Sequence, residues 1–325
     1  MIENASDSDK VKNSTNNHIF LRSEQFAHNF LLHFTVFLLG FTGILGRLIT
    51  VPSDVLVWYR MLIAAFSIGC ILLFSRQTLR MPVKDILIMA GIGVVVALHW
   101  ITFFGAIKLA NVSVTLLCLS ATTLFVALAE PLVFRTRISW LEIALGVIIV
   151  VSLFLVLYRQ MYGTEEQPEH FAAGVVTGIV SAILSGVFTL LNKKVATRYN
   201  GFVLTFYEMT GGVIAITAWF AATQNTGILE PLIWQDWLWL LVLGVICTGF
   251  AFWTMVRILQ KVSAYTLVLA INMEPVYGFV MAAVIFGENK VLGESFYLGS
   301  AVIIASIFVY SWLKRKQNAP GKMPA

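Results

Sequence analysis

The residues of this sequence that could do chemistry are ionisable and polar side chains placed inside long apolar runs. Glu274 precedes Pro275 near the middle of one such run. Proline lacks a backbone N–H, so a carbonyl one turn earlier loses its helical partner. A carboxylate beside a free carbonyl can bind a cation or a proton, which makes Glu274 a candidate for substrate binding and for proton or ion coupling. The alternative is a neutral glutamic acid that hydrogen-bonds to a neighbouring helix.

A second Glu-Pro pair, Glu130-Pro131, lies toward the end of an earlier apolar run. Glu130 is therefore another candidate for proton or ion coupling. The alternative is a kink at the end of a helix, where the Glu130 carboxylate pairs with Arg135 or Arg137. The sequence leaves both interpretations open.

Arg60 and Glu208 occupy corresponding places in two further apolar runs. A charged side chain in the middle of a bilayer costs about 2.5–3.5 kcal/mol on insertion scales, so such residues usually face a cavity or a partner. We expect Arg60 to bind an anionic group of a substrate, and Glu208 to bind a cationic group or a coupling proton. The alternative for both is a structural ion pair, with the Arg60 side chain reaching toward the membrane surface.

Four uncharged or weakly basic polar residues complete the candidate site: His99, Thr122, Thr123 and Asn272. Each can hydrogen-bond a substrate. His99 can also relay protons, because histidine titrates near neutral pH, or it can simply bond across two packed helices. The sequence has no zincin His–Glu spacing, no Gly-x-Ser-x-Gly motif and no phosphate-binding loop. We therefore predict no catalytic residues, no metal site and no cofactor.

The composition excludes an ordinary soluble enzyme. Hydrophobic residues make up 58% of the 325 positions and charged residues only 12%, whereas soluble domains carry about 25% charged residues. The 24 Phe, 9 Trp and 9 Tyr also exclude a disordered chain. The sequence therefore predicts a multi-pass protein of the cell membrane (the inner or plasma membrane) that contacts membrane lipids.

Ten apolar runs are long enough to cross a bilayer, which takes about 20 helical residues. Strands of a membrane barrel would be shorter and would alternate apolar with polar residues. We therefore predict an all-α bundle of ten transmembrane helices. The expected spans are 29–49, 55–75, 86–107, 112–134, 139–158, 171–192, 202–222, 237–257, 262–286 and 292–312.

The basic residues predict the orientation of these helices. Of the 22 Lys and Arg residues, 17 fall on the side that holds both termini. Since positive charge collects on the cytoplasmic side, we expect the tails 1–28 and 313–325 to be cytoplasmic. The Lys and Arg residues are scattered among loops, so they do not indicate nucleic-acid binding. The other side holds Arg47, Lys108, Arg159 and Lys290.

Similar segments recur at an offset of 147–153 residues, which indicates an internal duplication. Leu56–Met61 resembles Leu204–Met209, and Leu109–Ser113 resembles Leu259–Ser263. We predict five-helix repeats at 29–158 and 171–312, joined by an external linker at 159–170. Because five is odd, the second repeat would enter the membrane from the opposite side, as in many secondary transporters.

These features resemble the EamA family of the drug/metabolite transporter superfamily. The resemblance rests on the 5+5 layout, on Tyr59-Arg60, on Asn272-Met273-Glu274-Pro275 and on Phe286-Gly287-Glu288. It implies a compact bundle around a central cavity, and uptake or export of small organic solutes. The first repeat departs from the motif, because Thr122-Thr123 stands nearest the place that matches Glu274-Pro275.

The most economical functional interpretation is a secondary active transporter. We expect an exporter or exchanger of small organic metabolites, such as amino acids or related solutes, that works by alternating access around a midplane cavity. Ten helices can enclose a cavity in one chain, so a monomer or a homodimer would suffice. The alternatives are a membrane-embedded enzyme acting on a lipid-linked substrate, or a passive membrane scaffold.

Overall fold

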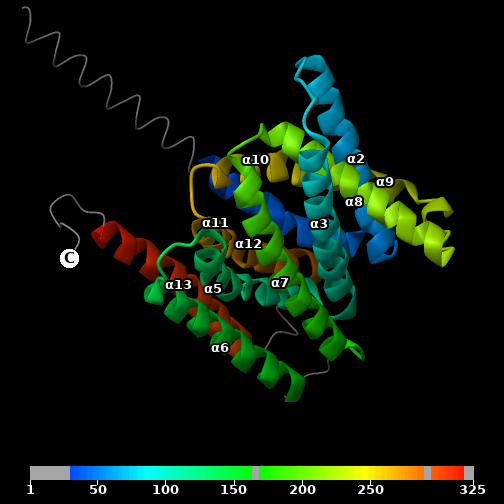
Figure 1. Ribbon diagram of the computed structural model, residues 1–325. Coiled ribbons are helices and arrows are strands. Elements are labelled where there is room, and N and C mark those ends of the chain that lie inside the picture. Colours follow the sequence, from blue (N-terminus) through cyan, green and yellow to red (C-terminus); the bar gives the residue numbers. More distant parts are fainter. Residues whose placement is uncertain (1–29, 163–167, 289–293, 318–325) are drawn as a thin grey trace, which may run out of the picture.

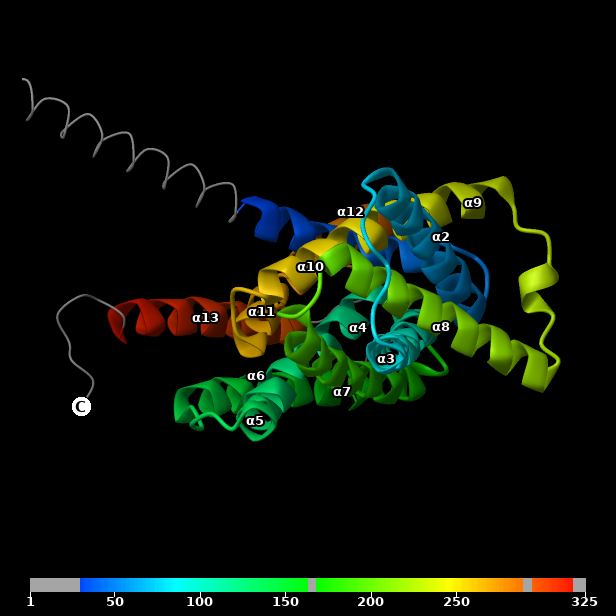
Figure 2. The same ribbon diagram turned by 45° about the horizontal axis from the view of Figure 1, so that its top comes forward.

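The computed structural model describes residues 30–162, 168–288 and 294–317, and every regular element in these ranges is a helix. The predicted tail at 1–28 lies outside the described residues, as do 318–325 and the centre of the predicted linker. The helices pack into one bundle (Figure 1), in which α6 and α13 lie side by side along one flank. In Figure 2, α3 lies between α7 and α8, and it packs against both of them.

Nine candidate membrane spans occur within the described residues, and each agrees with a predicted apolar run to within four residues at both ends. The multi-pass membrane architecture is thereby confirmed. The last helix, α13 (Glu294–Gln317), carries a shorter apolar stretch, so the count of ten spans stays a prediction. The nine are Phe30–Leu48, α2 (Ser53–Phe74), α3 (Val83–Leu109), α4 with α5 (Val112–Leu119, Thr122–Phe134), α6 (Trp140–Tyr162), α7 (Phe171–Ala196), α8 (Gly201–Thr223), α9 with η2 and α10 (Trp234–Leu241, Val242–Phe250, Ala251–Leu259), and α11 with α12 (Ala264–Ile271, Glu274–Phe286).

Two of these spans are broken in the same way. Helices α4 and α11 begin at Val112 and Ala264, and helices α5 and α12 begin at Thr122 and Glu274, so each pair is 152 residues apart. The two members of each pair also have equal lengths, 8 residues for the first helix and 13 for the second. The two broken spans therefore share one pattern of helix lengths, at an offset within the range of the repeated sequence segments.

Only one of the two breaks has an evident sequence cause. Pro275 stands in the first turn of α12, where it cannot donate to the carbonyl of Ile271. The break between α4 and α5 has no proline nearby. There Thr122 Oγ1 donates to the Ala182 carbonyl of α7 at 2.9 Å, which ties the start of α5 to a neighbouring helix.

A π-helical segment, η2, interrupts the span between α9 and α10. Within it, Thr248 Oγ1 donates to the carbonyl of Leu243, five residues earlier, at 2.7 Å. Gly244 lies close to the Ile63 side chain of α2, where a larger residue would clash. Short π-segments are rare and often occur at functional sites. Here the segment places Thr248 against α2.

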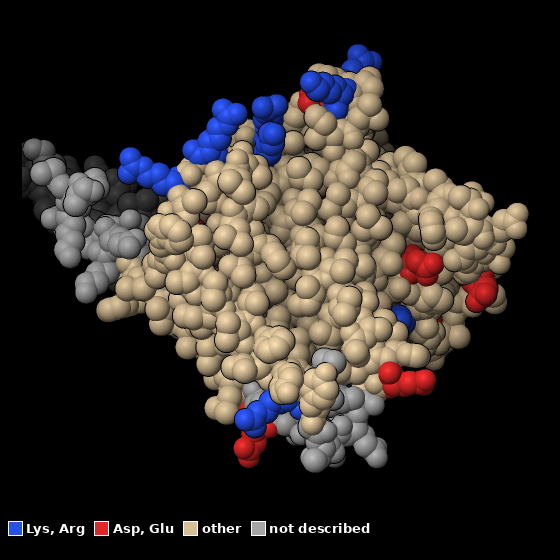
Figure 3. Space-filling model, turned by 60° about the horizontal axis from the view of Figure 1, so that its bottom comes forward, with Lys and Arg blue, Asp and Glu red and all other residues tan. Residues whose placement is uncertain are grey.

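The basic side chains are unevenly distributed over the surface. On the face shown in Figure 3, Lys and Arg gather along one edge, and most of the visible acidic side chains lie toward the other. The predicted orientation rests on the Lys and Arg residues alone, which collect on the cytoplasmic side of membrane proteins.

The contact between α3 and α8 leaves no room for a side chain at Gly93. An added Cβ would overlap the backbone of Glu208, so Gly93→Val must push the two helices apart. We expect a loss of about 1–3 kcal/mol of folding free energy, measured as a lower thermal unfolding temperature in detergent. Gly91→Val is the matched control, because nothing lies within 4 Å of its Cβ position. Equal unfolding temperatures for the two variants would contradict this packing.

Candidate functional site

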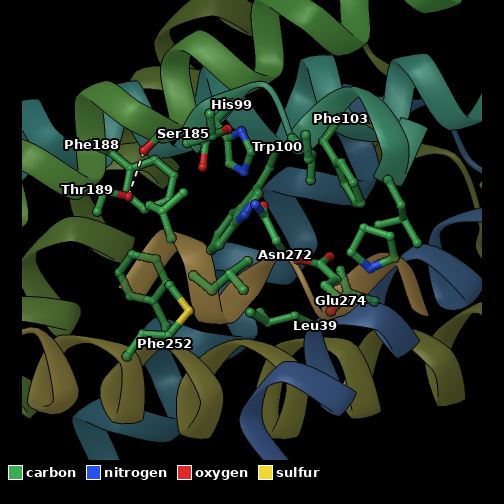
Figure 4. A pocket seen from close by; sticks show the side chains of 18 of the residues that line it. Leu39, His99, Trp100, Phe103, Ser185, Phe188, Thr189, Phe252, Asn272 and Glu274 are labelled. Carbon is green, nitrogen blue, oxygen red and sulfur yellow. Dashed lines mark hydrogen bonds between the residues drawn. The ribbon is translucent and has the colours of Figure 1, made fainter. Parts of the chain in front are cut away.

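A cavity of about 70 Å³ lies in the interior of the bundle, where helices of both repeats meet (Figure 4). This volume holds a few water molecules. The two helix breaks face it, through Ser120 in the first repeat and Asn272 in the second. Its polar or ionisable lining residues are Thr42, Arg60, His99, Ser120, Thr122, Ser185, Thr189, Cys247, Asn272 and Glu274.

Arg60 is the most constrained of the lining residues. Its side chain is only 1% exposed, and its Nε donates to Thr248 Oγ1 of the π-helical segment at 2.6 Å. The guanidinium carbon lies 3.7 Å from the centre of the Trp100 ring, within the range of cation–π attraction. Among the described residues, however, its Nη1 has no hydrogen-bond partner. A fixed cation with a free donor at a cavity is suited to bind an anion.

Glu274 provides the opposite charge in the same cavity. It opens α12, is 6% exposed and interacts electrostatically with Arg60. The two side chains do not form an ion pair within 4 Å, since the described part of the chain has such a pair only between Arg47 and Glu288. The cavity therefore holds one carboxyl and one guanidinium group that are near each other but not joined.

The remaining polar candidates already bond across helices. Asn272 Nδ2 donates to Thr123 Oγ1 at 2.6 Å, which links the two broken spans. His99 Nδ1 lies 2.9 Å from both the hydroxyl and the carbonyl oxygen of Ser181 in α7. The His99 ring also packs against Phe188, with ring centres 5.2 Å apart. His99, Thr122 and Asn272 line the cavity, whereas Thr123 is not one of its lining residues.

Glu208 lies outside the cavity lining. Its side chain is fully buried beside the α3–α8 contact, and neither carboxyl oxygen has a hydrogen-bond partner among the described residues. Asn192 of α7 is the polar side chain that interacts with it. The structure thus brings Arg60 together with Glu274 and not with Glu208.

Glu130 is also remote from the cavity. Its two carboxylate oxygens accept hydrogen bonds from the backbone N–H groups of Ala264 (2.9 Å) and Tyr265 (2.7 Å), the first residues of α11. In the part of the chain that the structure describes, it forms no ion pair with Arg135 or Arg137. Glu130 is thus a helix cap, and negative charge at a helix start is favourable.

Glu288 does the same for the first repeat, and the candidate residues from the sequence did not include it. It accepts hydrogen bonds from the backbone N–H groups of Val112 (3.3 Å) and Ser113 (3.0 Å) and from the Ser113 hydroxyl, and it pairs with Arg47. Each repeat therefore caps the broken span of the other. The Gly287-Glu288 motif was the available signal, but only the fold brings it to α4.

A second pair of contacts accompanies these crossed caps. Lys108 Nζ donates to the Ile49 carbonyl at 2.9 Å. Gln260 Nε2, 152 residues later, donates to the Ala196 carbonyl at 2.7 Å. In each repeat, the end of the third span thus holds the end of the first span. Equivalent contacts therefore lie beside the start of α4 and the start of α11.

Comparisons with known proteins identify the family of this chain. The model of the EamA-like transporter family matches residues 28–158 and again residues 172–312. An uncharacterized transporter of Bacillus subtilis (strain 168), YxxF, is 22% identical over 270 residues, which cover 82% of this chain and 84% of that protein. The biotin transporter of Escherichia coli (strain K12) is 24% identical over 222 residues, or 67% of this chain and 69% of that protein.

A solved crystal structure shares the fold, with a TM-score of 0.65 at 20% identity over 89% of this chain and 98% of that one. The resemblance drawn from the sequence motifs is confirmed, because the family model covers both halves of the chain. The nine apolar spans agree with a protein of the cell membrane. This chain belongs to the EamA-like transporter family and is a membrane transporter.

Proposed function

We propose that this transporter carries a small organic carboxylate, such as an amino acid, which binds between Arg60 and Glu274. The observation that carries the proposal is the buried guanidinium whose Nη1 has no partner among the described residues. A substrate carboxylate would supply that partner through a charge-assisted hydrogen bond. The ammonium group of an amino acid would then face Glu274. Biotin, the solute named for one relative, is also a carboxylic acid.

The aromatic rings around the cavity support binding of the rest of the solute. Trp100 and Phe252 pack edge to face with ring centres 5.8 Å apart, and Phe188 lies 6.0 Å from Phe252. Such rings bury apolar or planar groups at low entropic cost. Asn272 and Thr122 supply polar contacts at the two helix breaks.

Glu274 is our candidate for proton coupling. A carboxyl group that shares a buried cavity with an arginine can gain or lose a proton when a substrate carboxylate binds that arginine. Proton release and substrate binding would then be linked. Glu208 stays a second candidate, since it is buried without a hydrogen-bond partner among the described residues, and Glu130 a third.

The crossed caps support alternating access by two oppositely oriented repeats. Glu288 binds the start of the span that contains α4 and α5, and Glu130 lies near the end of that same span. The two caps therefore lie at opposite ends of this span. Release of one cap at a time would open the cavity to one side at a time, which is the requirement for coupled transport.

The rival functions have less support. An enzyme acting on a lipid-linked substrate would need clustered acid, base or metal-binding groups. Within the described residues, no group of three or more His, Cys, Asp and Glu side chains is arranged to hold a metal. A passive scaffold would have no use for a buried arginine whose Nη1 has no hydrogen-bond partner among the described residues.

Replacement of Arg60 tests the substrate class. In proteoliposomes, we expect Arg60→Gln to weaken uptake of carboxylate solutes (amino acids and biotin) by roughly 10–150-fold, the equivalent of about 1.5–3 kcal/mol for a hydrogen bond to a charged group. Uptake of the corresponding amides should change little. Arg159→Gln, at an exposed arginine, is the control. Equal losses for acids and amides would assign Arg60 a structural role.

Replacement of Glu274 tests coupling. We expect Glu274→Gln to abolish accumulation driven by a pH gradient but to retain exchange of labelled for unlabelled solute, because the amide keeps the shape and loses the exchangeable proton. The exposed Glu230 provides the control variant Glu230→Gln. Normal gradient-driven accumulation by Glu274→Gln would remove this residue from the coupling role.

The native thiol Cys247, which lines the cavity, reports which end is open. In a Cys70→Ser, Cys118→Ser background, we expect Glu288→Ala to increase labelling of Cys247 by a membrane-impermeant thiol reagent from outside. Glu130→Ala should increase labelling from the cytoplasmic side. The loss of a cap costs about 0.5–2 kcal/mol, so the labelling rate should rise by up to roughly 30-fold.

The control for the thiol experiment is Asn111→Ala. It removes a cap that α4 receives from its own repeat, where the Asn111 side chain accepts from Val114 N at 2.8 Å, and it leaves the link between the repeats intact. An increase from the same side for Glu288→Ala and Glu130→Ala would contradict alternating access through these caps.

A further inference from the structure

A second hollow lies on the outside of the bundle, between α2 and α8. It is an open groove of about 410 Å³ and shares no lining residue with the central cavity. Its walls are apolar, and the side chains of Phe66 and Leu73 on one wall are 74% and 73% exposed. The lining residues are Leu62, Ala65, Phe66, Gly69, Cys70, Leu73, Leu79, Phe206, Thr210 and Val213.

The floor of the groove presents no group that needs a hydrogen bond from an occupant. Ala65 and Gly69 are small residues of α2, and a Cβ added at Gly69 would lie 3.2 Å from the Phe206 ring of α8. The hydroxyl of Thr210 donates to the Phe206 carbonyl of its own helix at 2.8 Å. Both helices are candidate membrane spans, so this apolar surface is placed to contact lipid acyl chains.

One end of the groove is closed by the connection between α2 and α3. Leu79 of this connection lines the groove, and its carbonyl accepts a hydrogen bond from Tyr207 Oη at 2.7 Å. Just beyond, Tyr199 Oη donates to Asp85 at 2.6 Å. The first bond holds Leu79 on α8, and the second joins the start of α3 to the residues just before α8. Arg80 directly follows Leu79, and Arg76 lies three residues after the lining residue Leu73.

These two arginines, Arg76 and Arg80, give the groove a charged end. Both side chains are exposed, and neither forms an ion pair within 4 Å in the described residues. The nearby Asp85, in the first turn of α3, accepts a hydrogen bond from Tyr199. Arg76 has a left-handed backbone with φ of 50°, which turns the chain between Leu73 and Leu79.

We propose that this groove binds an anionic phospholipid. One acyl chain lies between α2 and α8, and the phosphate and its anionic headgroup are held by Arg76 and Arg80. The argument is charge complementarity at the end of an apolar groove, since basic pockets beside membrane helices bind anionic headgroups. The groove and the cavity are separate sites, so this proposal and the substrate proposal can fail independently.

Photo-crosslinking of defined lipids tests the proposal. The full chain is placed in nanodiscs with phosphatidylglycerol or phosphatidylcholine that carries a diazirine on one acyl chain, and crosslinked peptides are mapped by mass spectrometry. We expect phosphatidylglycerol to label the segments 62–73 and 206–213 roughly tenfold more than phosphatidylcholine does, given the attraction of two arginines. Arg76→Gln with Arg80→Gln should reduce the labelling to the phosphatidylcholine level.

The matched control is Arg135→Gln with Arg137→Gln, which removes two exposed arginines from another connection and should leave the labelling unchanged. Thr210→Phe fills the groove without changing a charge and should reduce labelling by both lipids. Equal labelling by the two lipids in the unmodified chain would overturn the proposal. So would full labelling of the Arg76→Gln, Arg80→Gln variant or of the Thr210→Phe variant.

Discussion

A bilayer contains no water to pair with backbone N–H groups, so the protein must supply every partner. The same constraint applies at the end of a span, where the rest of the bundle buries a helix start. The first residues of α4 (Val112 and Ser113) and of α11 (Ala264 and Tyr265) are all buried, at 0% exposure. A carboxylate from the opposite repeat satisfies each of these helix starts, and the two broken spans are held in place by that exchange.

The position of the cavity follows from the broken spans. Both breaks face it, and Asn272 at one break donates to Thr123 of the other span. Across the cavity, the π-helical segment turns Thr248 toward Arg60. A regular helix at that place would shift the later residues of the span relative to α2. The irregular segments of this otherwise uniform helical protein are therefore the ones that build its polar interior.

Much of the architecture could be predicted from the sequence, because long apolar runs have few alternatives in a membrane. The repeat was also predictable, since the similar segments recur in order. The break between α4 and α5 was not, because it lacks a proline and depends on a bond from Thr122 to another helix. The pairing of Arg60 with Glu274 and the isolation of Glu208 depend on which helices meet, and single-sequence patterns do not contain that information.

Although the two caps are equivalent in role, they are built differently. Glu288 follows the left-handed Gly287, pairs with Arg47 and accepts a bond from a hydroxyl as well as from the backbone. Glu130 lies within α5 and, among the described residues, accepts from backbone N–H groups alone, while the nearby Lys193 donates to the carbonyls of Leu259 and Val262. Although the two halves of the sequence are similar, these different contacts make the free energies of the two caps unequal. In the proposed alternating-access mechanism, unequal caps would give the empty protein a preferred facing direction before any solute or gradient acts on it.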